Sequence, residues 1–290
     1  MPFRPRAEIR IELEPDEAPP GDSVEVAILV VPVDDLELVE GRIDLVYENE
    51  YTYRTRRYSY LTKLSSVRDE TVTDVVVEES ARFLEAGALV ADTPYEDAVT
   101  LTVPESAAPS AEGEITSVRW WAIATLVRQR GRDLRGYAEL TVLSEAGQEL
   151  GPAVVATHRD CELSFELDRD DFGPGDIVEG TLVATPIRAC AVREVRVELI
   201  RHEEVPRDEG NAVDVTEDEA TLAEGVSLSP GLPHEWPFRL DLPEIVVPSL
   251  RSDQSRVTCS WQGSARGDCA RTIESHCRSM FTAHRRRIAA

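Results

Sequence analysis

Tyrosine and arginine side chains crowd into one short stretch of the chain, and these two residue types are enriched at the anchors of protein interfaces. Both combine a large contact area with a polar tip, so they indicate binding rather than bond breaking. The stretch runs from residue 47 to residue 61 and contains Tyr47, Tyr51, Tyr53, Arg54, Arg56, Arg57, Tyr58 and Tyr60. The alternative is an ordinary strand pair in which these side chains pack flat along a sheet.

Acidic and histidine residues are frequent, but their spacing does not indicate catalysis. The pairs Asp34-Asp35, Asp170-Asp171 and Glu203-Glu204 are typical of turns or solvated faces rather than of a catalytic dyad. His158, His202 and His234 stand alone in charged or loop contexts. The chain also lacks a Gly-x-Ser-x-Gly motif, a glycine-rich phosphate loop and the His-x-x-x-His and Cys-x-x-Cys spacings of metal ligands. We therefore expect no catalytic residue, no cofactor and no metal site. A hydrolase of unfamiliar type would need a pocket with converging polar groups.

The elements that position these residues are predicted to be strands. Short segments of alternating or β-branched apolar residues recur between Pro, Gly and Asp signals, as in Ala7–Leu13, Ser23–Val31 and Leu38–Tyr47. No segment keeps a helical apolar period over three turns, so the predicted fold class is all-β. The segment Val118–Val127 is apolar on both faces, which marks Trp121 as a candidate contact to another domain or chain. The alternative is a tryptophan covered by loops of its own domain.

The chain matches itself. When residues 7–50 are laid on residues 161–204 at a constant offset of 154, fourteen of the forty-four positions are identical, including Pro20-Gly21-Asp22 with Pro174-Gly175-Asp176. Random pairing gives roughly one match in fifteen to twenty. A second block matches at an offset of 139 and places Leu101 and Pro104 on Leu240 and Pro243. We interpret this as an internal duplication, with both glycine turns equivalent.

The two offsets differ by fifteen, so the first copy carries fifteen extra residues between Tyr51 and Ala98, beside the Tyr/Arg stretch. Insertions of that size belong in surface loops or extended hairpins. The predicted domains are a sandwich at 1–146, a linker at 147–159, a second sandwich at 160–262 and an atypical tail at 263–290.

This repeated pattern resembles the arrestin superfamily, which includes bacterial sporulation-control proteins. The resemblance rests on the Pro-Gly-Asp-x-Val-Glu turn in both copies, on the Leu-x-x-Pro element and on Ser117–Leu126, and it covers residues 7 to about 262. It implies two tandem immunoglobulin-like or arrestin-like β-sandwich domains joined by a short linker. The chain departs from the family in having a single lysine for phosphate contacts and no Pro-Pro-x-Tyr motif.

Composition limits the partners. The net charge of −24 opposes a sequence-independent grip on nucleic acid or anionic lipid. No apolar run is long enough to span a bilayer and the opening residues lack a signal-peptide core, so we expect a cytoplasmic protein without membrane insertion. Five cysteines, an odd number, indicate reduced thiols.

The end of the chain differs from the rest. The first 262 residues carry a net charge of −28, whereas the last twenty-eight carry +4 and lose the apolar alternation. We expect this tail to lie outside the second sandwich, leaving that sandwich about two strands short, and a change of reading frame is one explanation. Cys269, Cys277, His276 and His284 do not match a common zinc spacing.

Together these observations predict a non-catalytic intracellular adaptor or scaffold that binds protein partners. The alternative is a β-sandwich carbohydrate-binding or accessory module of an enzyme system. The sequence leaves the partner's identity and the oligomeric state open.

Overall fold

The computed structural model describes residues 7–61, 63–144, 156–158, 161–169, 171–244, 246–251, 258–269 and 272–283. The described residues form strands and no helix, so the protein is all-β as predicted. The first unit, residues 7–144, holds β1 (Ala7–Glu14), β2 (Glu17–Ala18), β3 (Ser23–Pro32), β4 (Leu36–Ser59), β5 (Leu64–Leu84), β6 (Gly87–Leu89), β7 (Tyr95–Thr102), β8 (Ala111–Glu112), β9 (Thr116–Arg128) and β10 (Leu134–Val142). The second unit, the described residues from 156 to 283, holds β11 (Ala156–His158), β12 (Cys161–Leu167), β13 (Asp171–Phe172), β14 (Ile177–Pro186), β15 (Cys190–Val205), β16 (Asn211–Leu228), β17 (His234–Asp241), β18 (Leu250–Arg251), β19 (Thr258–Cys269) and β20 (Thr272–Ala283).

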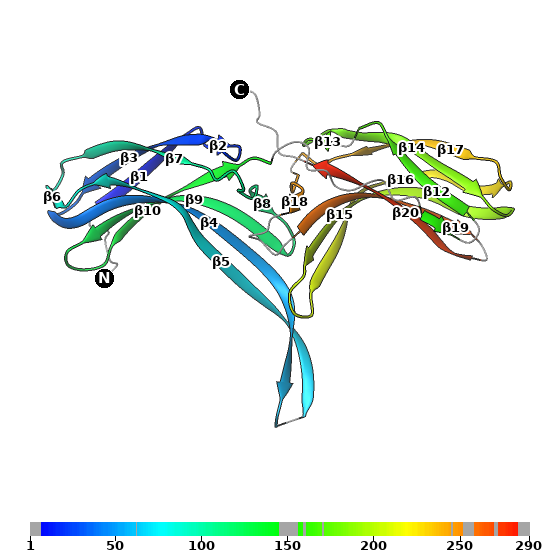
Figure 1. Cartoon of the computed structure of the whole chain (residues 1–290), viewed down its shortest axis with the longest axis horizontal. Helices are drawn as coiled ribbons and strands as arrows, with labels where there is room; N and C mark the ends of the chain where they lie inside the picture. Colours follow the sequence, from blue (N-terminus) through cyan, green and yellow to red (C-terminus); the bar gives the residue numbers. More distant parts are fainter. Residues whose placement is uncertain are drawn as a thin grey trace.

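Each unit consists of two layers (Figure 1). In the first unit a three-stranded sheet, β1-β3-β7, faces a seven-stranded sheet ordered β2-β10-β9-β4-β5, with β6 paired to β4 and β8 paired to β9. In the second unit β11-β12-β14-β17 faces a six-stranded sheet ordered β13-β20-β19-β15-β16, with β18 paired to β19. Apart from β6 and β11, which have no counterpart in the other unit, the strand orders of the two units therefore correspond.

The correspondence extends to the pairing register. In the first unit Ala7 pairs with Pro32, and in the second Cys161 pairs with Pro186, the positions 154 residues further on. Ser23 pairs with Thr102 in the first unit, and Ile177 pairs with Asp241 in the second. Ile177 lies 154 residues after Ser23 and Asp241 lies 139 residues after Thr102, which are the two offsets of the sequence match. The expectation that residues 7–50 and 161–204 form equivalent strands is confirmed. Internal duplication as the origin of this likeness stays a prediction.

The two glycine turns also agree. Gly21 and Gly175 both have positive φ, at 83° and 68°, which glycine adopts without steric cost. The backbone N–H of Asp22 bonds to the carbonyl of Pro19, and that of Asp176 bonds to the carbonyl of Gly173, the equivalent position. The predicted pair of equivalent tight turns is confirmed.

A separate apolar core fills the space between the layers of each unit. In the first unit the side chains that β3, β4 and β9 turn inward meet around Trp120, which is fully buried and donates its indole N–H to the carbonyl of Ala108 at 2.9 Å. The core of the second unit is built around Phe172, Leu182 and Leu199. Alternation along each strand, with a period of two residues, supplies these inward side chains.

The hairpin of β4 and β5 projects well beyond the body of the first unit (Figure 1). Strand β4 has 24 residues, whereas its counterpart β15 has 16. The extra residues of the first copy therefore lie largely in this hairpin, as expected for an insertion. Strand β5 is the last strand of its sheet, and no described strand other than β4 pairs with it.

The tail is the point at which the sequence-based expectation is wrong. Residues 263–269 continue β19, which pairs with β15, and residues 272–283 form β20, which pairs with β19. These two strands take the places of β9 and β10, so the second unit is not short of strands. Backbone hydrogen bonds can build a ladder whatever the side chains are, so loss of apolar alternation did not prevent pairing here. The predicted linker, 147–159, lies outside the described residues except for Ala156–His158 in β11.

Candidate binding surface

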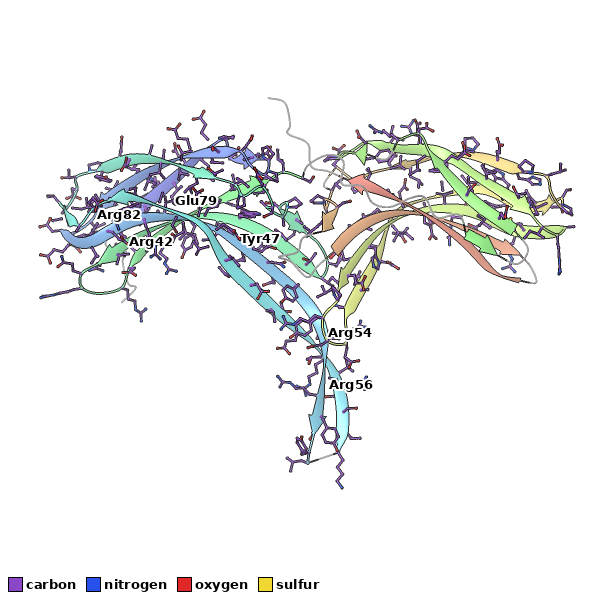
Figure 2. All side chains as sticks on the ribbon, viewed as in Figure 1. Arg42, Tyr47, Arg54, Arg56, Glu79 and Arg82 are labelled. Carbon is purple, nitrogen blue, oxygen red and sulfur yellow. The ribbon has the colours of Figure 1, made fainter. Side chains whose placement is uncertain are left out.

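The structure divides the Tyr/Arg stretch into three parts. Tyr47 is not a surface residue, because only 1% of it is exposed and its ring packs against Trp120 with centroids 5.1 Å apart. Tyr51, Tyr53, Arg54 and Arg56 lie where the hairpin passes the second unit, whereas Arg57, Tyr58 and Tyr60 lie beyond it. Figure 2 shows Tyr47 within the first unit and Arg54 and Arg56 along the projecting hairpin.

The middle part forms a joint between the two units. Tyr51 and Tyr53 are 2% and 4% exposed and form a small cluster with Val205, the last residue of β15. The guanidinium of Arg207 lies over the Tyr53 ring, 4.5 Å from its centroid, and also donates a hydrogen bond to the Tyr51 hydroxyl. Stacking of an arginine on an aromatic face provides a cation–π contact as well as apolar contact.

An acidic neighbour completes the environment of Tyr51. Its hydroxyl donates a hydrogen bond of 2.9 Å to Asp74 on β5. Burial, and then this hydrogen bond, raise the pKa of Tyr51 above its ordinary value of 10.0.

Backbone contacts reinforce the joint. The N–H of Arg54 bonds to the carbonyl of Gly210, and the carbonyl of Arg54 accepts from the N–H of Glu209. The side-chain amide of Asn211 donates to the carbonyl of Thr52 at 3.0 Å, and Arg56 pairs with Glu209 at 3.1 Å. The turn between β15 and β16 is therefore hydrogen-bonded along the β4 strand.

A buried carboxylate makes the second contact between the units. Glu203 on β15 is fully buried and accepts hydrogen bonds of 3.0 Å from the backbone N–H groups of Glu114 and Ile115 in the first unit. It also pairs with Arg201, which pairs in turn with Glu217 at 2.8 Å. A buried charge needs such partners, and here they come from both units. Glu203 is thus not the solvated-face residue that the sequence indicated, although its neighbour Glu204 is exposed.

Close approach at this contact requires a glycine. A Cβ atom on Gly113 would lie 2.5 Å from the Glu203 carboxylate. Two apolar residues of the second unit, Val247 and Leu250, also belong to the core cluster of the first. The joint therefore combines polar and apolar contacts. Its residues contact each other within the chain.

Trp121 lies on the other face of the seven-stranded sheet, which faces away from the core. Along this face the pairing register aligns Val77, Val46 and Trp121 across β5, β4 and β9. Val75, Ile123 and Tyr137 extend the same surface, and we call these six residues the outer patch. Val75, Val77 and Tyr137 are 60%, 56% and 58% exposed, and Trp121 is half-buried. The prediction that residues 118–127 are apolar on both faces is confirmed.

The outer patch has a charged border. Asp44 on β4 pairs with Arg42 at 3.1 Å and accepts a hydrogen bond of 2.6 Å from Ser80. Glu48 and Glu50 of β4, paired with Val75 and Thr73 of β5, place acidic side chains on the same face. Beyond Val77, Glu79 accepts the backbone N–H of Thr102 from β7, so that end of β5 is held to the opposite sheet. The more distant part of the β5 edge is left available for pairing.

The third part of the stretch, residues 57–61, lies at the tip of the hairpin, and the tip continues through residues 63–68. Tyr60 and Leu61 are 88% and 98% exposed, and Leu64 is 68% exposed. Tyr58 and Tyr60 contact each other edge to face, with ring centroids 5.2 Å apart. Strong exposure of large apolar side chains at the end of a projecting element marks an interaction site.

Three other features of the described surface bear on whether it holds a binding or catalytic site. An open depression on the outer face of the three-stranded sheet lies over the small side chains of Ala27 and Ala98, between Arg10, Glu12 and Glu96. His202 is paired with Asp214 at 2.6 Å rather than isolated. Among the described side chains, no three His, Cys, Asp or Glu residues gather in a way that could hold a metal ion. The side chains of Cys269, His276, Cys277 and His284 lie outside the described set.

Comparison of the chain with protein-family models and with curated proteins finds no match. The arrestin resemblance therefore stays a prediction from the sequence. A search of the described residues for membrane-spanning helices also finds none.

Sequence reasoning missed three parts of this surface. The alternation of β4 could have placed Tyr47 in the core, because Ile43, Leu45 and Tyr47 follow one another on the same face. It could not have found Glu203 and Arg207, whose partners lie in the other unit. The three consecutive valines of β5, Val75 to Val77, are the signal in the sequence that points to this surface.

Proposed function

We propose that this protein is a non-catalytic intracellular adaptor whose outer patch and β5 edge bind a protein partner. The single observation that supports the proposal is the exposure of Val75 and Val77 on an edge strand, on the same face of the sheet as the half-buried Trp121. Edge strands present unpaired backbone groups, and natural proteins usually protect them with charges, proline or a covering segment. An exposed edge strand with apolar side chains among its charges is a surface that accepts an added strand.

The charges of β5 favour one kind of partner segment. Between Leu64 and Ser80 the strand carries five acidic residues and one arginine. A second copy paired along this edge would place two acidic strands side by side, which is unfavourable. The proposed partner is therefore an extended segment in which apolar residues alternate with lysine or arginine.

The joint supports an adaptor rather than two independent modules. Glu203 and Arg207 of the second unit are used up in contacts with the first, so both units are held as one body while the outer patch stays open. Tyr51, Tyr53, Arg54 and Arg56, predicted as partner-binding residues, serve the joint in this proposal.

Affinity capture with the full chain tests the proposal when paired variants are compared. We expect the double substitution Val75→Asp, Val77→Asp to abolish retention of a partner that the unaltered chain retains. Val33→Asp changes a valine of similar exposure, 53%, outside the patch, and it is expected to retain the same partner. Equal retention by all three proteins would refute the proposed surface.

A further inference from the structure

The tip of the β4–β5 hairpin concentrates positive charge on a strongly acidic protein. Residues 51–68 contain five basic side chains and no acidic one, although the whole chain has a net charge of −24. Two of the five are paired: Arg54 with Asp69 at 3.7 Å and Arg56 with Glu209 at 3.1 Å. The other three are Arg57, Arg68 and Lys63, which is the only lysine of the chain. None of these three forms an ion pair with a described residue.

The same tip carries apolar side chains at its extreme end. Leu61 and Leu64 lie at the turn, 98% and 68% exposed, and Tyr60 beside them is 88% exposed. Pairing across the hairpin sets Arg57 opposite Ser66 and Tyr58 opposite Ser65, so the basic and aromatic side chains alternate between its two faces. Lys63 lies at this apolar end, Arg57 lies a few residues back on β4, and Arg68 pairs with Thr55 close to the joint.

The acidic body does not cancel the field of this tip. A strand advances about 3.3 Å per residue, so Ser59, the last residue of β4, lies roughly 10 Å beyond Arg56 of the Arg56–Glu209 contact, and the turn with Leu61 follows it. At physiological ionic strength the screening length is about 8 Å. The distance exceeds one screening length, so the charges of the tip contribute strongly to what the tip attracts. Net charge alone opposes a grip on anionic lipid, whereas the local charge of the tip favours one.

We propose that the hairpin tip docks on an anionic lipid surface. Leucine enters the boundary of the acyl chains, tyrosine lies at the headgroup level, and lysine and arginine contact the lipid phosphates. A projecting finger with side chains exposed on all sides suits a deformable bilayer, whereas a protein partner would need a pocket of matching shape. The contact is peripheral, and the hairpin does not cross the bilayer.

Co-sedimentation of the full chain with vesicles tests this inference. One set contains phosphatidylcholine alone, and the other contains phosphatidylcholine and phosphatidylglycerol in a two-to-one ratio. We expect binding to the mixed vesicles, weak binding to phosphatidylcholine alone, and loss of binding at high NaCl because the attraction is screened. Absence of binding to the mixed vesicles at low salt would overturn the proposal.

Two variants locate the site. The double substitution Arg57→Gln, Lys63→Gln is expected to weaken binding on the order of thirtyfold, from two basic residues near an anionic surface. Leu61→Ser, Leu64→Ser is expected to weaken it at least about tenfold, through lost apolar burial. Unchanged binding by either variant would refute the assignment to the tip.

Matched controls separate the tip from general surface effects. Arg130→Gln, Arg132→Gln removes exposed charge from the β9–β10 loop, and Leu232→Ser removes a leucine that is 58% exposed in the second unit. Both controls are expected to bind mixed vesicles as the unaltered chain does. If the chain instead binds soluble polyglutamate through its tip but ignores mixed vesicles, the tip recognises an acidic protein and the lipid proposal is wrong. Val75→Asp, Val77→Asp is expected to keep vesicle binding, so the test is independent of the proposed adaptor function.

Discussion

The substitution Glu203→Gln removes one negative charge from the centre of the joint without changing the shape of the side chain. In the native protein the two carboxylate oxygens accept from two backbone N–H groups, one from Glu114 and one from Ile115, each at 3.0 Å. Glutamine offers one oxygen, so one of these buried donors would face an amide NH₂ group. The ion pair with Arg201 is lost as well.

The size of the effect follows from these partners. Removing one member of a buried ion pair typically costs about 3–5 kcal/mol, and a buried donor left unsatisfied costs about 1–3 kcal/mol. Arg201 keeps its contact with Glu217 at 2.8 Å, which limits the first cost. We therefore expect the free energy of unfolding to fall by about 3 kcal/mol, near the lower end of the range for a buried pair. The urea midpoint falls by about 1–2 M for an m-value of roughly 1.5–3 kcal/mol/M.

Equilibrium unfolding in urea, followed by circular dichroism and tryptophan fluorescence, measures this change. Glu204→Gln is the control, because it makes the same charge change on the exposed side of the same strand and is expected to shift stability by less than about 0.5 kcal/mol. A loss below about 1 kcal/mol for Glu203→Gln would show that the buried carboxylate does not hold the units together.

Three further outcomes are expected. Gly113→Ala should destabilise the joint by about 1–3 kcal/mol in urea unfolding, because its Cβ would meet the carboxylate at 2.5 Å, whereas Gly87→Ala, with its nearest neighbour at 4.0 Å, should not. Trp120→Ala should cost about 3–5 kcal/mol and Trp121→Ala clearly less, since only the first is fully buried; equal losses would contradict the assignment of the two faces. The folded state raises the pKa of Tyr51. The contribution of Tyr51 to the free energy of unfolding is therefore complete below pH 10 and is lost as pH rises through the raised pKa. Unfolding titrations of the native chain and Tyr51→Phe should therefore converge above that pH, and a constant difference would contradict this.

The strands could be predicted because their information is local. Alternation with a period of two residues records which face of a strand meets the core, and Pro-Gly-Asp records the turn. The offset alignment then carried the register of one unit onto the other, from Ala7–Pro32 to Cys161–Pro186. Pairing in the tail escaped this reasoning, because a ladder of backbone hydrogen bonds leaves no necessary mark on side-chain pattern.

The joint could not be predicted, because burial of its residues depends on distant segments. Glu203 and its backbone donor at Glu114 are 89 residues apart, and Arg207 and Tyr51 are 156 apart. Neighbours in sequence give no hint of either contact: Glu203 and Glu204 are identical in type, yet one is fully buried and the other exposed. What separates them is the position of the first unit, which only the folded chain supplies.

The hairpin of β4 and β5 also has a consequence for how the protein can change its dimensions. From Tyr51 to Arg56, β4 contacts both the first and the second unit. A residue inserted before Tyr51 would therefore turn Tyr51 and Tyr53 to the opposite face of the strand. Beyond Arg56 no such constraint applies. One residue added to each strand there would lengthen the reach of the tip by about 3.3 Å while both bodies stay as they are. Evolution and engineering can therefore use this segment as an adjustable arm, and a fluorescent probe or a grafted recognition sequence inserted there would report from a known distance without altering either core.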